Sequence, residues 1–284
     1  MARLGTLLLF CLSSVLCGVT LLCGGCGPDN RLGLSVGQAL VDGPIRIYAS
    51  QQAVQVALSA RSLSLATQEE MGMPRDRLAA REHWLAVRLA YDLGSAFFFV
   101  ATPDLNQALD GRFDDRLATN GLRQLEPLLF SNTPPDAVRL DRLGQSLLQA
   151  GVALSNATPN PANAVTLSAF LGSLSAQAAV AATKLDGSDS PYAGVSHRSI
   201  EYNLLGLQAM YLALAPAVQN ADPDLHARIV GLLTALLSQV QGVAGVDGVV
   251  NKVAFLRSCG DLSAAFLAIG TALGLSVAAP VDVT

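Results

Sequence analysis

Apolar residues recur at helical spacing through most of the chain. In the segment 51–68, Val54, Leu58 and Leu65 fall on one side of a helix, and the segment 75–97 carries a similar stripe of leucines at positions 78, 85, 89 and 93. We expect both stripes to face the core of a helical bundle. Further helices are predicted at 136–155, 161–185, 195–215, 222–241 and 249–273. No stretch alternates apolar and polar positions for long, so the pattern predicts an all-α protein.

Short stretches rich in Pro, Gly, Asn and Asp separate these helices. They include "TPPD", "TPNPAN", "DGSDSPYAG" and "NADPD". The Pro- and Asn-rich stretch at 158–163 marks the expected boundary between two packed antiparallel helical bundles. We therefore predict a linker at 27–44, an N-terminal bundle at 45–157 and a C-terminal bundle at 158–284, the two bundles together forming one domain.

The N-terminus has the layout of an export signal. A single positive charge at Arg3 precedes an apolar run over 7–22, which ends in small residues before Cys26. We predict a signal peptide over 1–26.

Cys26 is also a candidate for lipidation. Small residues just before a Cys resemble a bacterial lipobox, in which the Cys becomes the new N-terminus and carries lipid, although Cys23 stands where Leu is usual. We predict a periplasm-facing lipoprotein held to the membrane of a bacterial envelope by lipid on Cys26. An ordinary signal peptide cut near the same place is the alternative. Gly27 is not the Asp that often signals inner-membrane retention, which favours the outer membrane.

Charge and cysteine content narrow the function classes. Charged residues make up 14% of the chain and the net charge is −4, so no basic stripe exists for a nucleic acid to follow. Of the 5 cysteines, only Cys259 lies beyond the leader. We expect it to be a buried structural residue, since its neighbourhood in sequence offers no His to activate it as a nucleophile.

The stretch "NGLRQLEPLLF" places a carboxylate on an apolar helix face. On a helical wheel Glu126 lies at about 40° from Leu122, within the apolar side of the segment. A buried carboxylate without compensation costs several kcal/mol, so Glu126 should be protonated, paired or bound to a metal. Arg123, three residues earlier, is a candidate partner, and Pro127 should interrupt the helix beside it.

This stretch resembles the Gly-x-His-x-x-Glu segment of the imelysin family of bacterial envelope proteins. "AAREHWLAVRLAYDLGSAF" is similar to the Trp-bearing helix before that segment, "SHRSIEYNLLGLQAMY" to the family's Asn-Leu-x-Gly-Leu-x-x-Tyr helix, and "AIGTALGLSV" to its closing Leu-Gly end. The resemblance extends from about Arg46 to Val277. It implies a two-bundle all-α fold, and it links the chain to insulin-cleaving membrane proteases and to lipoproteins of iron uptake.

The resemblance also implies a site at this segment, where His and Glu could hold a metal or take part in hydrolysis. Gly121 and Glu126 match the family pattern, but Arg123 occupies the His position. Arg is permanently charged and does not ligate a metal, so a zinc-peptidase interpretation loses its first ligand.

The 3 histidines of the chain offer little to replace the missing His ligand. His197 and Glu201 are four apart and could share a helix side as an iron or zinc ligand pair, but a solvent-edge ion pair is the favoured interpretation. Asn203 falls on a helix side that should face the seam between the bundles, where it could bond across the seam or line a cleft. Gly206 on the same helix permits close helix approach.

Three function classes are compatible with these features. The favoured one is an envelope lipoprotein that binds iron or another metal and takes part in iron uptake with other envelope proteins. The second is an imelysin-type metallopeptidase, which Arg123 disfavours. The third is a non-catalytic protein-interaction bundle. The candidate site residues are Gly121, Arg123, Glu126, His197, Glu201 and Asn203, with Cys26 as the lipidation site.

Overall fold

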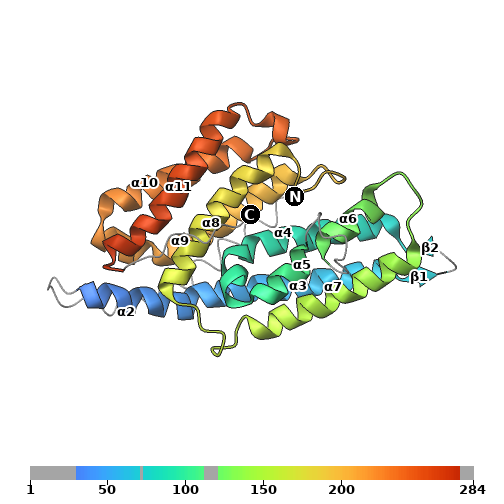
Figure 1. The fold of residues 1–284 in the computed structure, drawn as a ribbon, viewed down its shortest axis with the longest axis horizontal. Coiled ribbons are helices and arrows are strands. Elements are labelled where there is room, and N and C mark those ends of the chain that lie inside the picture. The colour runs from blue at the N-terminus through green and yellow to red at the C-terminus, as the bar shows by residue number, and fades with distance from the viewer. Residues whose placement is uncertain (1–29, 71–72, 112–120, 276–284) are drawn as a thin grey trace.

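The computed structural model describes residues 30–70, 73–111 and 121–275, and it is all-α apart from one very short hairpin. The first bundle contains α3 (Arg46–Thr67), α4 (Arg77–Ala101), α5 (Pro103–Asp110), α6 (Leu122–Phe130) and α7 (Ala137–Ala157), with a two-residue antiparallel pair, β1 (Glu69–Glu70) and β2 (Met73–Pro74), between α3 and α4. The second contains α8 (Leu167–Thr183), α9 (Ser196–Ala221), α10 (Pro223–Val240) and α11 (Lys252–Ala272), with short 3-10 turns η3 (Lys184–Asp186) and η4 (Val246–Gly248). Figure 1 shows them as two groups of helices lying one against the other.

The helices begin where the sequence supplies a cap. The side chains of Asp76, Asp136 and Asp222 accept hydrogen bonds from backbone N–H groups in the first turns of α4, α7 and α10. Thr166 does the same for α8, which therefore begins at Leu167 rather than at the predicted position 161. The predicted two-bundle, all-α architecture is confirmed, and the break between α7 and α8 contains the predicted boundary at 158–163.

The two bundles meet along α4, which packs against α8 and α9. The crossing with α9 is close, because a Cβ placed on Gly206 would lie 2.4 Å from the carbonyl oxygen of Leu93. Only Gly leaves room for the α4 backbone there, as the sequence led us to expect.

Residues 30–44 were predicted to be a linker, but they are helical. Helix α2 (Asn30–Leu40) continues through a π-helical turn, η2 (Val41–Ile45), into α3. The wider turn accommodates Pro44, which has no N–H to donate. Gln38 of α2 bonds the carbonyl of Val165 and the amide of Leu167, so this first helix ties down the start of the second bundle.

The apolar stripe predicted for α3 faces solvent instead of the core. Val54, Leu58 and Leu65 are exposed, and the buried side consists mainly of small residues: Ala49, Ala53, Val56, Ala60 and Leu63. Small side chains on α3 and glycines on α7 let the two helices approach closely, since a Cβ on Gly151 would lie 3.3 Å from the Cα of Ala57. Close backbone packing therefore determines which side of α3 is buried.

In α4 the predicted leucine stripe is only partly internal. Leu89 is buried, while Leu78 in the first turn is exposed. Cys259 is buried in α11 as predicted, and burial raises the pKa of its thiol to about 12. The leader 1–26 with Cys23 and Cys26, the residues 27–29 of the predicted linker and the C-terminal residues 276–284 lie outside the described residues.

Candidate functional site

A buried group of charged side chains lies where α4, α6 and α9 meet the loop 187–195, which connects η3 to α9. Arg88 and Asp92 occupy successive turns of α4 on the side that faces the second bundle, and Ser199 faces them from α9. Lys184 of η3 and Asp189 of the loop complete the buried part. We call these five residues the charged cluster.

Arg88 is its centre and is almost wholly buried. Its Nη2 donates to both carboxylate oxygens of Asp189, at 2.7 and 2.8 Å. Its Nη1 donates to Asp110 at the end of α5 at 2.9 Å, and its Nε to Asp92 and Ser199 at 3.3 Å each. One guanidinium of the first bundle thus binds a loop of the second.

Lys184 and Ser199 complete the hydrogen bonding around Asp92. The Lys184 ammonium donates to Asp92 and to the Ser199 hydroxyl, at 2.8 Å each. Ser199 in turn donates to the other Asp92 oxygen at 2.6 Å. All the carboxylate oxygens of Asp92 and Asp189 have donors, which is the condition for burying charges at tolerable cost.

The cluster reaches the surface at Arg123 and Asp110, which are about a quarter exposed. Arg123 donates to Asp189 at 3.0 Å and to Asp110 at 3.4 Å. Three cations, on Arg88, Lys184 and Arg123, thereby neutralise the carboxylates of Asp92, Asp110 and Asp189.

The charge balance fixes the protonation of Asp189 and Arg88. Burial by itself would raise the pKa of Asp189, but the charges of Arg88, Lys184 and Arg123 outweigh it and hold that pKa well below its usual range. Burial would likewise lower the pKa of Arg88, and the facing aspartates, Asp189 first, raise it instead. Both groups are therefore ionised at neutral pH.

Glu126 lies beside the charged cluster and is buried, as predicted. Its Oε1 accepts hydrogen bonds from the backbone N–H groups of Tyr192 and Ala193, at 2.9 and 2.8 Å. Arg123, proposed from sequence as its partner, bonds Asp189 and Asp110 instead. Oε2 of Glu126 has no hydrogen-bond partner among the described residues.

The two amides do not offset the burial of Glu126. Burial raises its pKa above the ordinary value, and the amides of Ala193 and Tyr192 and the charge of Arg88 oppose that rise only in part. This side chain therefore binds a proton more readily than an exposed glutamate does.

Gly121 has a backbone role. Its φ of +103° lies in the region that favours glycine, and a Cβ there would come within 2.9 Å of the backbone of Gly111. The two glycines bring the end of α5 next to the start of α6, and Trp84 fixes that start by donating from Nε1 to the carbonyl of Leu122 at 2.9 Å. Gly121 thereby helps to place Arg123 and Asp110 together.

Asn203 belongs to a neighbouring group of polar side chains at the same contact between the two bundles. Its Nδ2 donates to Gln177 of α8 at 2.9 Å and to Ser95 of α4 at 3.3 Å, and its Oδ1 has no partner in the part of the chain that the structure describes. Ser95 also donates to the carbonyl of Asp92, which joins this group to the charged cluster. Asn203 thus bonds across the two bundles, one of the two roles predicted for it.

His197 and Glu201 lie apart from the charged cluster. Both are half-buried on α9. Burial and the nearby charge of Arg198 lower the pKa of His197, whereas burial raises the pKa of Glu201. Within residues 30–70, 73–111 and 121–275, no three His, Cys, Asp or Glu side chains come together in a way that could hold a metal ion.

Arg88, Asp92, Lys184 and Asp189 were not predicted from the sequence. A signal existed for the first two, since Arg88 and Asp92 are four apart on the interior side of an otherwise apolar helix. No comparable signal marks Asp189, whose loop composition is typical of a solvent-exposed turn.

The arrangement supplies ion pairing and hydrogen bonding rather than nucleophilic chemistry. Ser199 is wholly buried, and the Lys184 beside it donates both to that hydroxyl and to Asp92. An ammonium has no lone pair with which to take the Ser199 proton. The residues do not fit a metal at the position of Arg123 either, because its guanidinium occupies the space between two carboxylates.

Comparison with known proteins is consistent with this architecture. No curated protein matches the sequence. A family model described as Imelysin matches residues 48–254, from the first turn of α3 to the first turn of α11, a span that includes every member of the charged cluster. The chain therefore belongs to the imelysin family.

Proposed function

We propose that this protein is an envelope lipoprotein of the imelysin family that takes part in iron uptake by binding a partner, without catalysing hydrolysis. The observation that supports the non-catalytic role is the pairing of Arg123 with Asp189 and Asp110 at the position of the family's His. A guanidinium there neutralises the carboxylates that a metal would need as ligands.

The link to iron uptake and to the membrane rests on the family resemblance and on the leader. Lipid on Cys26 would hold the folded bundles at the periplasmic side of the envelope, with the outer membrane favoured by Gly27. A Cys26→Ser variant should lose its place in the membrane fraction and should fail to restore growth of a deletion strain under iron limitation. Full complementation by the unanchored variant would contradict the lipoprotein role.

Metal binding at Glu126 is a second candidate, and one observation favours it. The Oε2 atom of this buried carboxylate has no partner within residues 30–70, 73–111 and 121–275, so it could bond an ion or a water. Iron or zinc bound there would make the protein a metal carrier rather than a partner-binding bundle.

One titration separates the two candidates. Ferrous iron, ferric iron and zinc are added in turn to the chain that starts at Gly27, to Glu126→Gln and to the matched control Glu201→Gln. Stoichiometric binding that Glu126→Gln loses and Glu201→Gln keeps would establish the second candidate. The first predicts no stoichiometric binding by any of the three proteins, and proteolytic activity that a chelator abolishes would overturn it.

A further inference from the structure

The solvent-facing side of α3 carries four aliphatic side chains in a row. Ile47, Val54, Leu58 and Leu65 are 56%, 45%, 53% and 47% exposed. Two exposed polar residues, Gln51 and Arg61, lie between them along the same side. We call these six positions the α3 seam.

The spacing of the α3 seam is that of a contact between two helices. Its positions, 47, 51, 54, 58, 61 and 65, are separated alternately by four and three residues, which is the repeat of a coiled-coil interface. Isolated exposed aliphatic residues need no explanation, but four of them at this spacing do.

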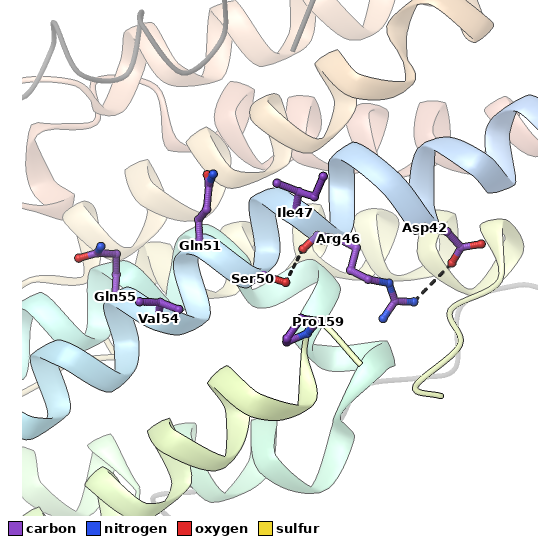
Figure 2. A pocket seen from close by; sticks show the side chains of 8 residues that line it. All are labelled: Asp42, Arg46, Ile47, Ser50, Gln51, Val54, Gln55 and Pro159. Carbon is purple, nitrogen blue, oxygen red and sulfur yellow. Dashed lines mark hydrogen bonds and ion pairs between the residues drawn. The ribbon is translucent and has the colours of Figure 1, made fainter. Parts of the chain in front are cut away.

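A hollow of about 560 Å³ runs beside the seam. Three seam residues, Ile47, Gln51 and Val54, line it together with Pro159 from the break between the bundles. The rest of its lining is polar: Asp42, Arg46, Ser50 and Gln55. Figure 2 shows Ile47, Gln51 and Val54 following one another along α3, with Pro159 on a different segment of the chain. The groove leaves space for side chains of a second helix laid along α3.

The order of residues in the seam is the same from either end. Ile47 and Leu65 are equally far from Val56, as are Gln51 and Arg61, and as are Val54 and Leu58. A two-fold axis that crosses the seam at the level of Val56 would therefore pair aliphatic with aliphatic residues and polar with polar residues in two antiparallel copies of α3.

The charges on α3 favour the same arrangement. The helix has no acidic residue, and Arg61 is its exposed cation. In the antiparallel pairing Arg61 of one copy faces the Gln51 amide of the other, which can accept a hydrogen bond. A parallel pairing would place the two Arg61 side chains against each other.

From this self-complementary seam we propose that two copies of the protein associate through antiparallel pairing of their α3 helices. A contact confined to one helix pair is at the small end of specific interfaces, so the dimer should be weak, with a dissociation constant in roughly the micromolar range. The proposal is independent of what the charged cluster does.

Sedimentation velocity on the chain from Gly27, which contains the whole described fold, tests the dimer over a range of concentrations. Leu58→Glu should raise the dissociation constant at least about tenfold, because it places a charge at the centre of the seam. The matched control is Val138→Glu, an equally drastic change at a 69% exposed valine of α7, which should leave the constant unchanged. Gln51→Glu should lower it, since each copy then offers Arg61 a carboxylate.

Cysteine cross-linking tests the register. Gln55 lies next to the proposed axis, so Gln55→Cys should form a disulfide-linked dimer on mild oxidation. Two Arg61→Cys side chains would be separated by ten residues of helix, about 15 Å, and should not cross-link. The native Cys259 is buried and does not interfere.

Three results would overturn the proposal. They are a chain that stays monomeric at the highest accessible concentration, a dimer that Leu58→Glu does not weaken, and cross-linking through Arg61→Cys but not Gln55→Cys. A monomer that binds phospholipid vesicles only when Leu58 is intact would assign the seam to a lipid surface instead.

Discussion

At the scale of single residues, Glu126 combines full burial with incomplete hydrogen bonding. Two backbone amides bind Oε1, while Oε2 has no partner among the residues that the structure describes. Helical periodicity was sufficient to predict the burial, because position in a short amphipathic segment determines it. The partners were not predictable, since Tyr192 and Ala193 belong to a loop brought to α6 by the packing of the two bundles.

The raised pKa of Glu126 predicts a specific dependence of stability on pH. Because the folded protein binds this proton more tightly than the unfolded chain, the stabilisation it provides is complete below the unfolded pKa of about 4.3 and is lost as pH rises through the folded pKa. Glu126→Gln keeps an oxygen for the two amides and removes the titration. The free energy of unfolding of the wild type should therefore fall relative to that of the variant as pH rises, by about 1.4 kcal/mol for each unit between the two pKa values.

Urea unfolding of both proteins between pH 4 and pH 7.5 measures this difference. Glu201→Gln is a useful comparison. Burial also raises the pKa of the Glu201 carboxyl, but Glu201 is not part of the hydrogen-bonded contact between the two bundles. If the unfolding free energies of the wild type and Glu126→Gln change with pH in parallel, then burial does not raise the pKa of Glu126 in the folded protein.

At the scale of helices, the sequence predicted where most elements lie but not always which side of them is buried. Helical spacing of apolar residues predicted α4 and α7 to α11, and Asp or Thr caps mark several of their starts. For α3 the same period pointed to the wrong side, because its alanines pack closely against α7 while Val54, Leu58 and Leu65 remain exposed. Periodicity detects an apolar stripe without distinguishing a core from an external contact.

Close backbone approach also makes the α4 and α9 crossing sensitive to a single methyl group. Gly206→Ala improves helix propensity but places a Cβ about where the Leu93 carbonyl lies. We expect the variant to lose about 1–3 kcal/mol of unfolding free energy through this overlap. Gly231→Ala in α10, where no atom lies within 4 Å of the added Cβ, should instead gain up to about 1 kcal/mol.

Thermal and urea unfolding of the two variants provide the check. If Gly206→Ala proves as stable as Gly231→Ala, the two helices must have room to separate at this crossing. The packing between the two bundles around the charged cluster would then be looser than the distances indicate.

At the scale of the whole molecule, the charged cluster joins the two bundles. The loop 187–195 follows α8 in the second bundle, yet Asp189 bonds Arg88 and Arg123 of the first, and the loop amides bond Glu126. These contacts join residues about seventy to one hundred positions apart in sequence, which is why helical patterns and local spacing could not reveal them.

This coupling predicts how the protein unfolds when Asp189 is changed. Asp189→Asn removes the carboxylate that accepts from both Arg88 and Arg123 and leaves excess positive charge in the buried cluster, so it should cost about 3–5 kcal/mol, far more than the loss of a surface carboxylate. The exposed Asp247, which pairs with Lys252 at the surface, provides the control, and Asp247→Asn should change stability little.

Because the lost contact lies between the bundles, Asp189→Asn should also separate the unfolding of the two bundles into two calorimetric transitions. One cooperative transition at an unchanged temperature would mean that α4 packing against α8 and α9 holds the bundles together without the ion pair.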